Sequence, residues 1–226
     1  MLLNMLSGGG DTRTYVMGLL LSLPIILLAL SLHETAHGYV AYKLGDPTAR
    51  NLGRLTLNPI KHLDPIGFLC MLFAGFGWAN PVPINTRNFK NPRRDMALSA
   101  AAGPISNLLL ALVFTALYKV FTLVVPHIAI TSETAFYIVY VIEIFIYLGI
   151  SLNISLAVFN LLPVPPLDGS RLFYVFLPPK TYFGVMKYER YISLGIMILL
   201  LVGALDGVIS FVRGGIMSLF FAIFGI

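Results

Sequence analysis

Residues 15–42 read YVMGLLLSLPIILLALSLHETAHGYVAY, and this stretch decides the fold. A helix needs about 20 apolar residues to cross a bilayer, so the stretch is long enough to span one. Its second half nevertheless contains His33, Glu34 and His37. Ionisable side chains are costly in hydrocarbon, and those found inside membrane segments mark functional sites. The sequence therefore predicts a membrane helix that carries the reactive part of the molecule.

The composition places the whole chain in a membrane. Of its 226 residues, 58% are hydrophobic and 11% are charged, and the mean hydropathy is +0.86. Soluble domains contain about a quarter charged residues. No long polar stretch is present that could form a soluble domain, so we expect residues 1–226 to form a single membrane domain. The basic residues behind the net charge of +5 are spread over the loops between apolar runs, where they serve orientation better than phosphate binding. We therefore expect membrane lipid around the chain and no nucleic acid as a partner.

Further apolar runs follow the first one. They occupy residues 66–79, 96–125 and 135–162, and two stretches after Arg190 that are split near Asp206. The run 66–79 is short for a span, so we expect a re-entrant or hairpin element there. Residues 78–85 read WANPVPIN, which predicts an extended segment and not a helix. The sequence thus predicts an all-α polytopic membrane protein of four to six segments, with the re-entrant or hairpin element after the first helix.

The distribution of lysine and arginine orients these segments. Nearly all of them lie in loops 43–62, 80–95 and 171–190. Loop 126–134 holds none. Basic loops face the cytoplasm, which requires the run 66–79 to enter the membrane and return on the same side. His33 precedes Lys43 by ten positions, about 15 Å of helix, so we expect an integral protein of a bacterial-type cell membrane with its site toward the cytoplasm.

The spacing of the two histidines predicts a metal site. On a helix, positions i and i+4 lie on one face, so His33 and His37 can bind a single metal ion. Glu34 follows the first histidine and is placed to act as a general base on water instead of binding the metal. A HExxH pair of this kind, completed by one more ligand, is typical of zinc hydrolases.

A catalytic zinc site needs a third protein ligand, and the residues alone leave several candidates open. A third histidine of the metzincin type would fall at residue 43, which is Lys43. The remaining candidates are Asp46, Asp64, Asp95, Glu133, Glu143, Asp168, Glu189, Asp206, His62 and His127. Asp168 is favoured because it follows a proline-rich break at the cytoplasmic end of the run 135–162. Asp206 would lie near the outer face, after a span that begins at Arg190.

Three motifs follow one another along the chain. They are HETAHGY at 33–39, AAGPISN at 101–107 and NLLPVPPLDG at 160–169. Together they resemble the site-2 protease family of intramembrane zinc metalloproteases. The resemblance implies a core of three membrane helices in which Zn2+ is bound by His33, His37 and Asp168. It also implies that Glu34 is the general base, and no PDZ or CBS domain is expected in this short chain.

The same resemblance assigns roles to two asparagines. Asn160 lies eight positions before Asp168 and is implied to contact the substrate or the oxyanion. Asn107 belongs to a GPxxN motif, which with Gly103 and Pro104 is implied to shape the site. We expect Asn160 or Asn107 to help to stabilise the oxyanion during hydrolysis.

The expected function is that of a zinc-dependent intramembrane endopeptidase, which hydrolyses transmembrane proteins or peptides near the cytoplasmic side. Two other classes stay open. A metal-ion transporter would not need a glutamate beside the first histidine, and transporters usually show repeated halves, which the sequence lacks. A catalytically inactive membrane scaffold would have no reason to keep both the ligands and the base.

Four residues or segments outside these motifs carry their own expectations. The extended residues 78–85 are expected to clamp an unwound substrate by adding a strand to it. Glu143 lies inside an apolar run and needs a partner, which favours a structural role. His62 and His127 lie in loops, where we expect them to be solvated.

Overall fold

The computed structural model describes residues 12–74, 77–178, 184 and 187–226, and within them the regular secondary structure is helical. Four of the described helices are long and apolar enough to cross a membrane. They are α2 (Thr12–Lys43), α5 (Pro92–Val124), α6 (Glu133–Asn160) and α10 (Asp206–Phe224). The expected all-α polytopic membrane protein is confirmed, and the chain is an integral membrane protein.

Shorter helices connect or flank these four. They are α3 (Thr48–Asn51), η1 (Pro59–Lys61), α4 (Pro65–Ala74), η2 (Thr86–Asn88), η3 (Val125–His127), α7 (Asp168–Phe173), η4 (Tyr174–Phe176) and α9 (Glu189–Leu201).

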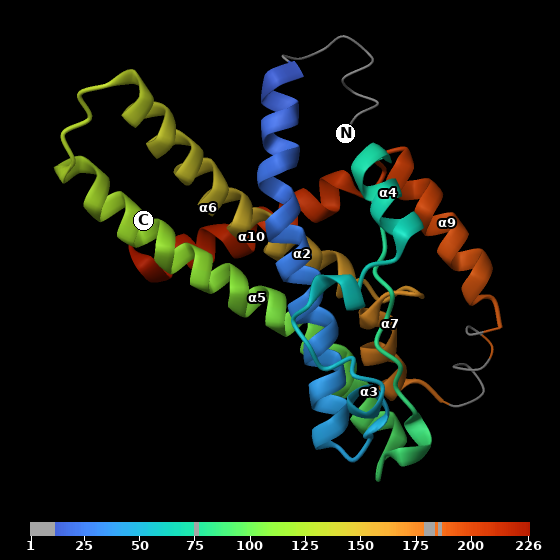
Figure 1. The fold of residues 1–226 in the computed structure, drawn as a ribbon. Coiled ribbons are helices and arrows are strands. Elements are labelled where there is room, and N and C mark those ends of the chain that lie inside the picture. Colours follow the sequence, from blue (N-terminus) through green and yellow to red (C-terminus); the bar gives the residue numbers. More distant parts are fainter. Residues whose placement is uncertain (1–11, 75–76, 179–183, 185–186) are drawn as a thin grey trace.

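Helices α5 and α6 form an antiparallel pair that runs through the length of the bundle (Figure 1). Proline is favoured in the first turn of a helix, and Pro92 begins α5. At the start of α6, the Ser132 side chain accepts a hydrogen bond of 3.1 Å from the Ala135 amide. The buried apolar cluster between the helices also includes one side chain of α10; its members are Ala111, Phe114, Ile150, Ile154, Val158 and Phe220.

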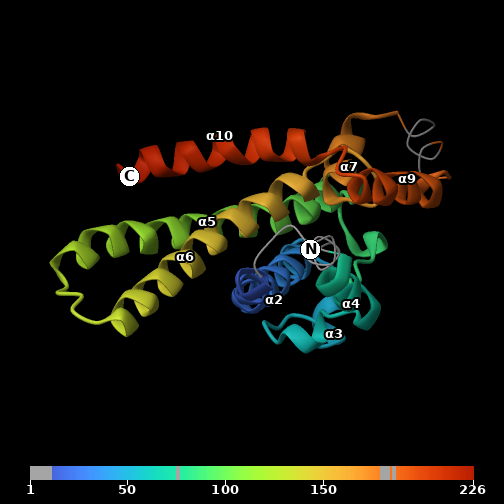
Figure 2. The ribbon, with the colours of Figure 1, turned by 90° about the horizontal axis from the view of Figure 1, so that it is seen from above.

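Helix α2 crosses this pair. In Figure 2 it is seen nearly along its axis, whereas α5, α6 and α10 run across the view. The helix continues without a break through Pro24. Its buried face begins with Ile25 and Ala29, and Ser31 satisfies its hydroxyl by donating to the Leu27 carbonyl at 2.6 Å. The crossing brings the HETAH end of α2 against the first half of α5.

The chain pairs with itself on either side of the run 66–79, of which the structure describes residues 66–74 and 77–79. Helix α4 ends at Ala74, short of the length of a span, and a β-bridge pairs Leu63 with Ala79. The Asn80 amide also donates to the His62 carbonyl at 2.8 Å. The hairpin predicted after the first helix is therefore present.

One expectation about this region is wrong. His62 is only 1% exposed, and its Nε2 lies 2.7 Å from the Thr56 carbonyl oxygen. The imidazole contacts the backbone of residue 56, and the chain that returns after α4 pairs with the backbone of His62, neither of which a loop position alone reveals. His127 is exposed, as expected.

The end of the chain also differs from the prediction. Helix α9 has 13 residues, which rise about 20 Å and cannot cross a hydrocarbon core of about 30 Å. The Lys119 ammonium donates to the Gly225 carbonyl at 2.8 Å, so α10 ends beside the last part of α5. Asp206 therefore lies toward the end of the bundle where α5 begins, and the expectation that it lies at the opposite face is wrong.

Candidate metal centre

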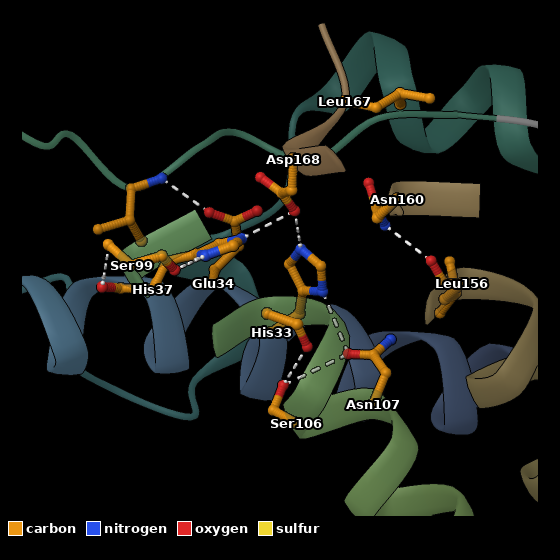
Figure 3. Close-up of polar contacts among 12 residues, drawn as sticks. His33, Glu34, His37, Ser99, Ser106, Asn107, Leu156, Asn160, Leu167 and Asp168 are labelled. Carbon is orange, nitrogen blue, oxygen red and sulfur yellow. Dashed lines mark hydrogen bonds and ion pairs between the residues drawn. The ribbon is translucent and has the colours of Figure 1, made fainter. Parts of the chain in front are cut away.

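His33, His37 and Asp168 converge on one point (Figure 3). The Asp168 Oδ2 atom lies 3.0 Å from His33 Nε2 and 3.1 Å from His37 Nε2. One potential ligand atom from each residue lies within 4.8 Å of the others. Among the described residues, this is the group of acidic, histidine and cysteine side chains that could hold a metal ion. The structure thus brings together three side chains that come from opposite halves of the chain.

Local structure explains how the three residues meet. The histidines are one turn apart on α2, with ring centroids 4.5 Å apart, and both are buried. Asp168 is the first residue of α7, and Gly169 follows it. A Cβ atom on Gly169 would collide with the backbone carbonyls of Leu161 and Leu162. Glycine therefore lets α7 begin directly against the end of α6, which directs Asp168 at the imidazoles.

Each imidazole is oriented by a second contact on its other nitrogen. His33 Nδ1 lies 3.2 Å from Asn107 Oδ1, and His37 Nδ1 lies 2.7 Å from the Ser99 carbonyl oxygen. Both partners are acceptors, which favours the tautomer with the proton on Nδ1 and the lone pair on Nε2. The Ser99 hydroxyl also donates to the His37 carbonyl at 2.9 Å. Such outer contacts fix the ring orientation of metal-binding histidines.

Gly103 provides the space for the two rings. A Cβ atom there would lie 2.6 Å from His33 Cε1 and 2.5 Å from His37 Cε1, and it would collide with His37 Nε2. Any larger residue would fill the volume in which the imidazoles lie. The GPxxN sequence thus supplies both the space, at Gly103, and an orienting acceptor, at Asn107.

Glu34 is buried beside this group without belonging to it. Its side chain is 8% exposed, and its Oε2 accepts a hydrogen bond of 2.8 Å from the Val82 amide. Because it neighbours His33 along the helix, the carboxylate lies next to the three converging side chains without taking the position of a ligand (Figure 3).

Asn160 is not part of the hydrogen-bonded group. Its Nδ2 donates to the Leu156 carbonyl at 3.0 Å, within its own helix. Figure 3 shows it to one side of Asp168. Its predicted contact with substrate therefore stays a prediction.

Electrostatics favour a cation at this point. In the tautomer fixed by Asn107 and Ser99, both Nε2 atoms present lone pairs to the Asp168 Oδ2 atom, at 3.0 and 3.1 Å. Three acceptor atoms that face one another in this way are satisfied by a cation between them. Two imidazole nitrogens and one carboxylate oxygen form a donor set that fits catalytic zinc, which takes water or substrate as its fourth ligand.

Several other candidates for the third ligand are engaged elsewhere. Asp46 accepts hydrogen bonds from Asn85 and Asn88, and Asp64 accepts one from the Gly67 amide. Asp95 pairs with Arg94, and Glu143 accepts from the Tyr118 hydroxyl at 3.2 Å. Glu143 therefore has the partner it was expected to need. Within the described part of the chain, none of these four carboxylates joins the group around Asp168.

Two buried histidines of a HExxH helix and a carboxylate from a later helix, enclosed by helices of membrane-spanning length, form a group that could hold a metal ion inside a membrane protein. Residues 21–207 match Peptidase family M50, and the chain belongs to this family. The resemblance to the site-2 protease family is thereby confirmed, together with the Zn2+ cofactor it implied.

Curated relatives carry matching names. The chain is 46% identical over 166 residues to "Putative zinc metalloprotease YwhC" of Bacillus subtilis, covering 74% of this chain and 73% of the relative. It is 30% identical to "Putative zinc metalloprotease Rip2" of Mycolicibacterium smegmatis and 29% identical to that of Mycobacterium tuberculosis, covering 80% of this chain and 66% of each relative. No solved structure matches the chain.

Three parts of the site could not be read from the motifs. The Ser99 carbonyl and the Val82 amide are backbone groups, which carry no signal in residue identity. The third part is Asp46, which the sequence shows as a carboxylate directly after the HExxH helix. Its contact with the segment that carries Val82 could not be inferred from the sequence.

Proposed function

We propose that this metalloendopeptidase hydrolyses peptide bonds of transmembrane proteins near the cytoplasmic face of the membrane, with zinc held by His33, His37 and Asp168. The observation that carries the proposal is the meeting of the Asp168 carboxylate with both Nε2 atoms, at 3.0 and 3.1 Å, inside a bundle of membrane-length helices. A soluble substrate would give no reason to bury this group among such helices.

Glu34 is the general base of the proposed reaction. When bound, zinc polarises the scissile carbonyl and lowers the pKa of water. The Glu34 carboxylate takes a proton from the attacking water, whose oxygen forms the new bond to the carbonyl carbon. The same proton then passes to the amide nitrogen as the carbon–nitrogen bond breaks. The position of Glu34 beside His33, outside the ligand group, supports this role.

The two asparagines have different places in the proposal. Asn107 positions His33 through its Oδ1 atom, while its Nδ2 atom is buried with no hydrogen-bond partner among the described residues. That donor is available for an oxyanion or a substrate carbonyl. Asn160 uses one N–H of its side-chain amide on the Leu156 carbonyl, which leaves its second N–H and its Oδ1 atom for contact with substrate.

The side of the membrane follows from the basic loops. Corner residues 44–62 and segment 80–91 are joined by hydrogen bonds, among them Arg54 to the Asn80 carbonyl at 2.7 Å. Loop 128–132 connects the opposite ends of α5 and α6. The positive-inside rule assigns the joined basic loops, and the site beside them, to the cytoplasmic side of a bacterial-type cell membrane.

A substrate helix must unwind before it is cleaved, because its carbonyls are bound within the helix. The segment 78–85, in which Val82 lies directly against Glu34, would bind the unwound chain as an added strand through backbone groups other than the Val82 amide. Transmembrane proteins or peptides, surrounded by lipid, are the proposed substrates.

The test begins with the purified chain in detergent. We expect one zinc per chain, hydrolysis of casein that a chelator stops and added zinc restores, and loss of hydrolysis with retained zinc in Glu34→Gln. Casein is unfolded, so its cleavage needs no unwinding step. Retained hydrolysis in Glu34→Gln would disprove the role of the base.

The substrate class needs a second measurement. Membranes with the wild-type chain are compared with membranes containing Glu34→Ala, and fragments cut near the cytoplasmic end of a transmembrane helix are sought by mass spectrometry. Fragments of that kind support the proposal. Zinc flux without cleavage would indicate a transporter. Zinc binding with neither flux nor cleavage would indicate a scaffold.

A further inference from the structure

The Val82 amide is the single N–H donor of its segment that can reach Glu34. Residues 81–83 read Pro-Val-Pro, and proline has no backbone N–H. The one remaining donor, at Val82, lies 2.8 Å from Glu34 Oε2. Among the described residues, no hydrogen bond to the other oxygen, Oε1, is recorded. The segment therefore binds one carboxylate oxygen and leaves the second open.

The surface of α2 is shaped to receive this segment. Gly38 lies one turn after Glu34 on the same face of the helix. A Cβ atom at Gly38 would lie 2.9 Å from Val82 Cγ1 and 2.7 Å from Leu55 Cδ2. The absence of a side chain at Gly38 lets the buried Val82 come close enough for its amide to reach the carboxylate.

Asp46 fixes the other end of the segment. It is fully buried, and its Oδ2 accepts from the Asn85 amide at 2.7 Å. Its Oδ1 accepts from Asn88 Nδ2 at 2.7 Å and from the Thr48 amide at 3.1 Å. The carboxylate thus joins the corner after α2 to the segment three residues beyond Val82.

We propose that the Val82 amide orients the Glu34 carboxylate for proton transfer, and that Asp46 is the positioning residue that holds this amide in place. The inference rests on the proposed function, in which Glu34 is the base. The terminal torsion of a glutamate is broad, so a buried carboxylate without a donor can turn through many orientations. One charge-assisted bond at Oε2 removes that freedom and directs Oε1 toward the site.

Hydrogen exchange tests the contact without measuring activity. In residues 81–84 only Val82 and Ile84 carry an exchangeable amide, so one short peptide reports on this bond. We expect the Val82 amide to be protected in the wild type, and to exchange at least about tenfold faster in Glu34→Ala and in Asp46→Asn. In Asp46→Asn an acceptor oxygen becomes a donor that faces the Asn85 or Asn88 donor.

Asp95→Asn is the matched control. Asp95 is also a buried carboxylate, and it accepts from the Asn91 amide at 3.0 Å and from Arg94 at the start of α5. Loss of these contacts disturbs a helix end without reaching Val82. Exchange at Val82 should therefore be unchanged in this variant. Equal acceleration in both variants would show a general loosening and overturn the role of Asp46.

The catalytic consequence is tested by replacing the Val82 amide with an ester, through the matching α-hydroxy acid. This removes the N–H and keeps the side chain. We expect kcat for casein to fall about 10- to 100-fold, with KM and zinc content unchanged. The same replacement at Ile84 is the control, since the Ile84 amide has no hydrogen bond recorded among the described residues.

A double variant decides whether Asp46 acts through this bond. If it does, Asp46→Asn lowers kcat in the wild type and has little further effect in the Val82 ester. Equal effects in both backgrounds would overturn the positioning role. An ester with wild-type kcat would overturn the inference, even if Asp46→Asn failed to fold. Glu34→Gln is measured in parallel with the Val82 ester. If Glu34→Gln is inactive and the ester is fully active, this inference alone is refuted. If Glu34→Gln is active, the proposed function is refuted.

Discussion

Substitution of Gly103 by alanine tests how the site holds its histidines. The new Cβ atom would lie 2.6 Å from His33 Cε1 and 2.5 Å from His37 Cε1. Carbon atoms in contact are separated by about 3.5–4.0 Å, so the rings or α5 must retreat by roughly 1 Å. Neither ring is free to move, because Asn107 and the Ser99 carbonyl hold their Nδ1 atoms.

A displacement of this size is large for a metal site. Metal–ligand distances in proteins are reproduced within about 0.2 Å. We therefore expect Gly103→Ala to weaken zinc binding at least about tenfold, in the range found when outer contacts of metal ligands are lost. Overpacking should also lower stability by about 1–3 kcal/mol.

The assay separates these two effects. The purified variant is stripped of zinc and titrated against a chromophoric chelator, and its thermal midpoint is measured in the same detergent. Gly149→Ala is the matched control, because a Cβ atom there would lie 2.5 Å from two ring atoms of Phe114, away from the site. Both variants should lose stability, and only Gly103→Ala should lose zinc affinity. A folded Gly103→Ala protein with wild-type affinity would refute the reasoning.

Three further predictions concern other contacts. Asn107→Leu removes the acceptor for His33 Nδ1 and should weaken zinc binding about 10- to 100-fold with the helical circular dichroism unchanged; unaltered affinity would contradict the orienting role. Burial alone would raise the pKa of Asp46, but the hydrogen bonds it accepts lower it, so its stabilising effect is complete above its ordinary pKa and is lost as the pH falls through the lowered value. The difference in thermal midpoint between the wild type and Asp46→Asn should therefore be constant above about pH 5 and shrink as the pH is lowered below about 4, and a difference that stays constant there would exclude this origin. Tyr118→Phe leaves Glu143 without its hydroxyl donor and should destabilise the protein by about 1–2 kcal/mol in thermal unfolding, whereas no change would show that the pair adds nothing.

Elements whose signal is local could be predicted from the sequence. The apolar runs gave the membrane helices, because length and hydropathy are properties of contiguous residues. The HETAH spacing placed both histidines on one face of α2, because helix periodicity needs no tertiary contact. Asp168 could be favoured from its proline-rich surroundings and from topology, and the resemblance to a known family then selected it.

Features that depend on packing could not be predicted in this way. Burial of His62 accompanies its pairing with the chain that returns after α4. The position of Asp206 results from the docking of α10 on α5 and α6. The bond from the Val82 amide to Glu34 spans 48 positions and involves a backbone atom. Residue type does not encode where such an atom points, so only the folded structure reveals it.

The order in which the chain is synthesised determines when the three residues of the site are all present. His33 and Asp168 are 135 positions apart, so the metal-binding pair and the carboxylate leave the ribosome at widely different times. A chain inserted only as far as α6 holds HETAH but lacks the acidic partner. Under the proposed function, the site is therefore completed only late in synthesis, and a translation product that stops before residue 168 lacks the proposed third ligand.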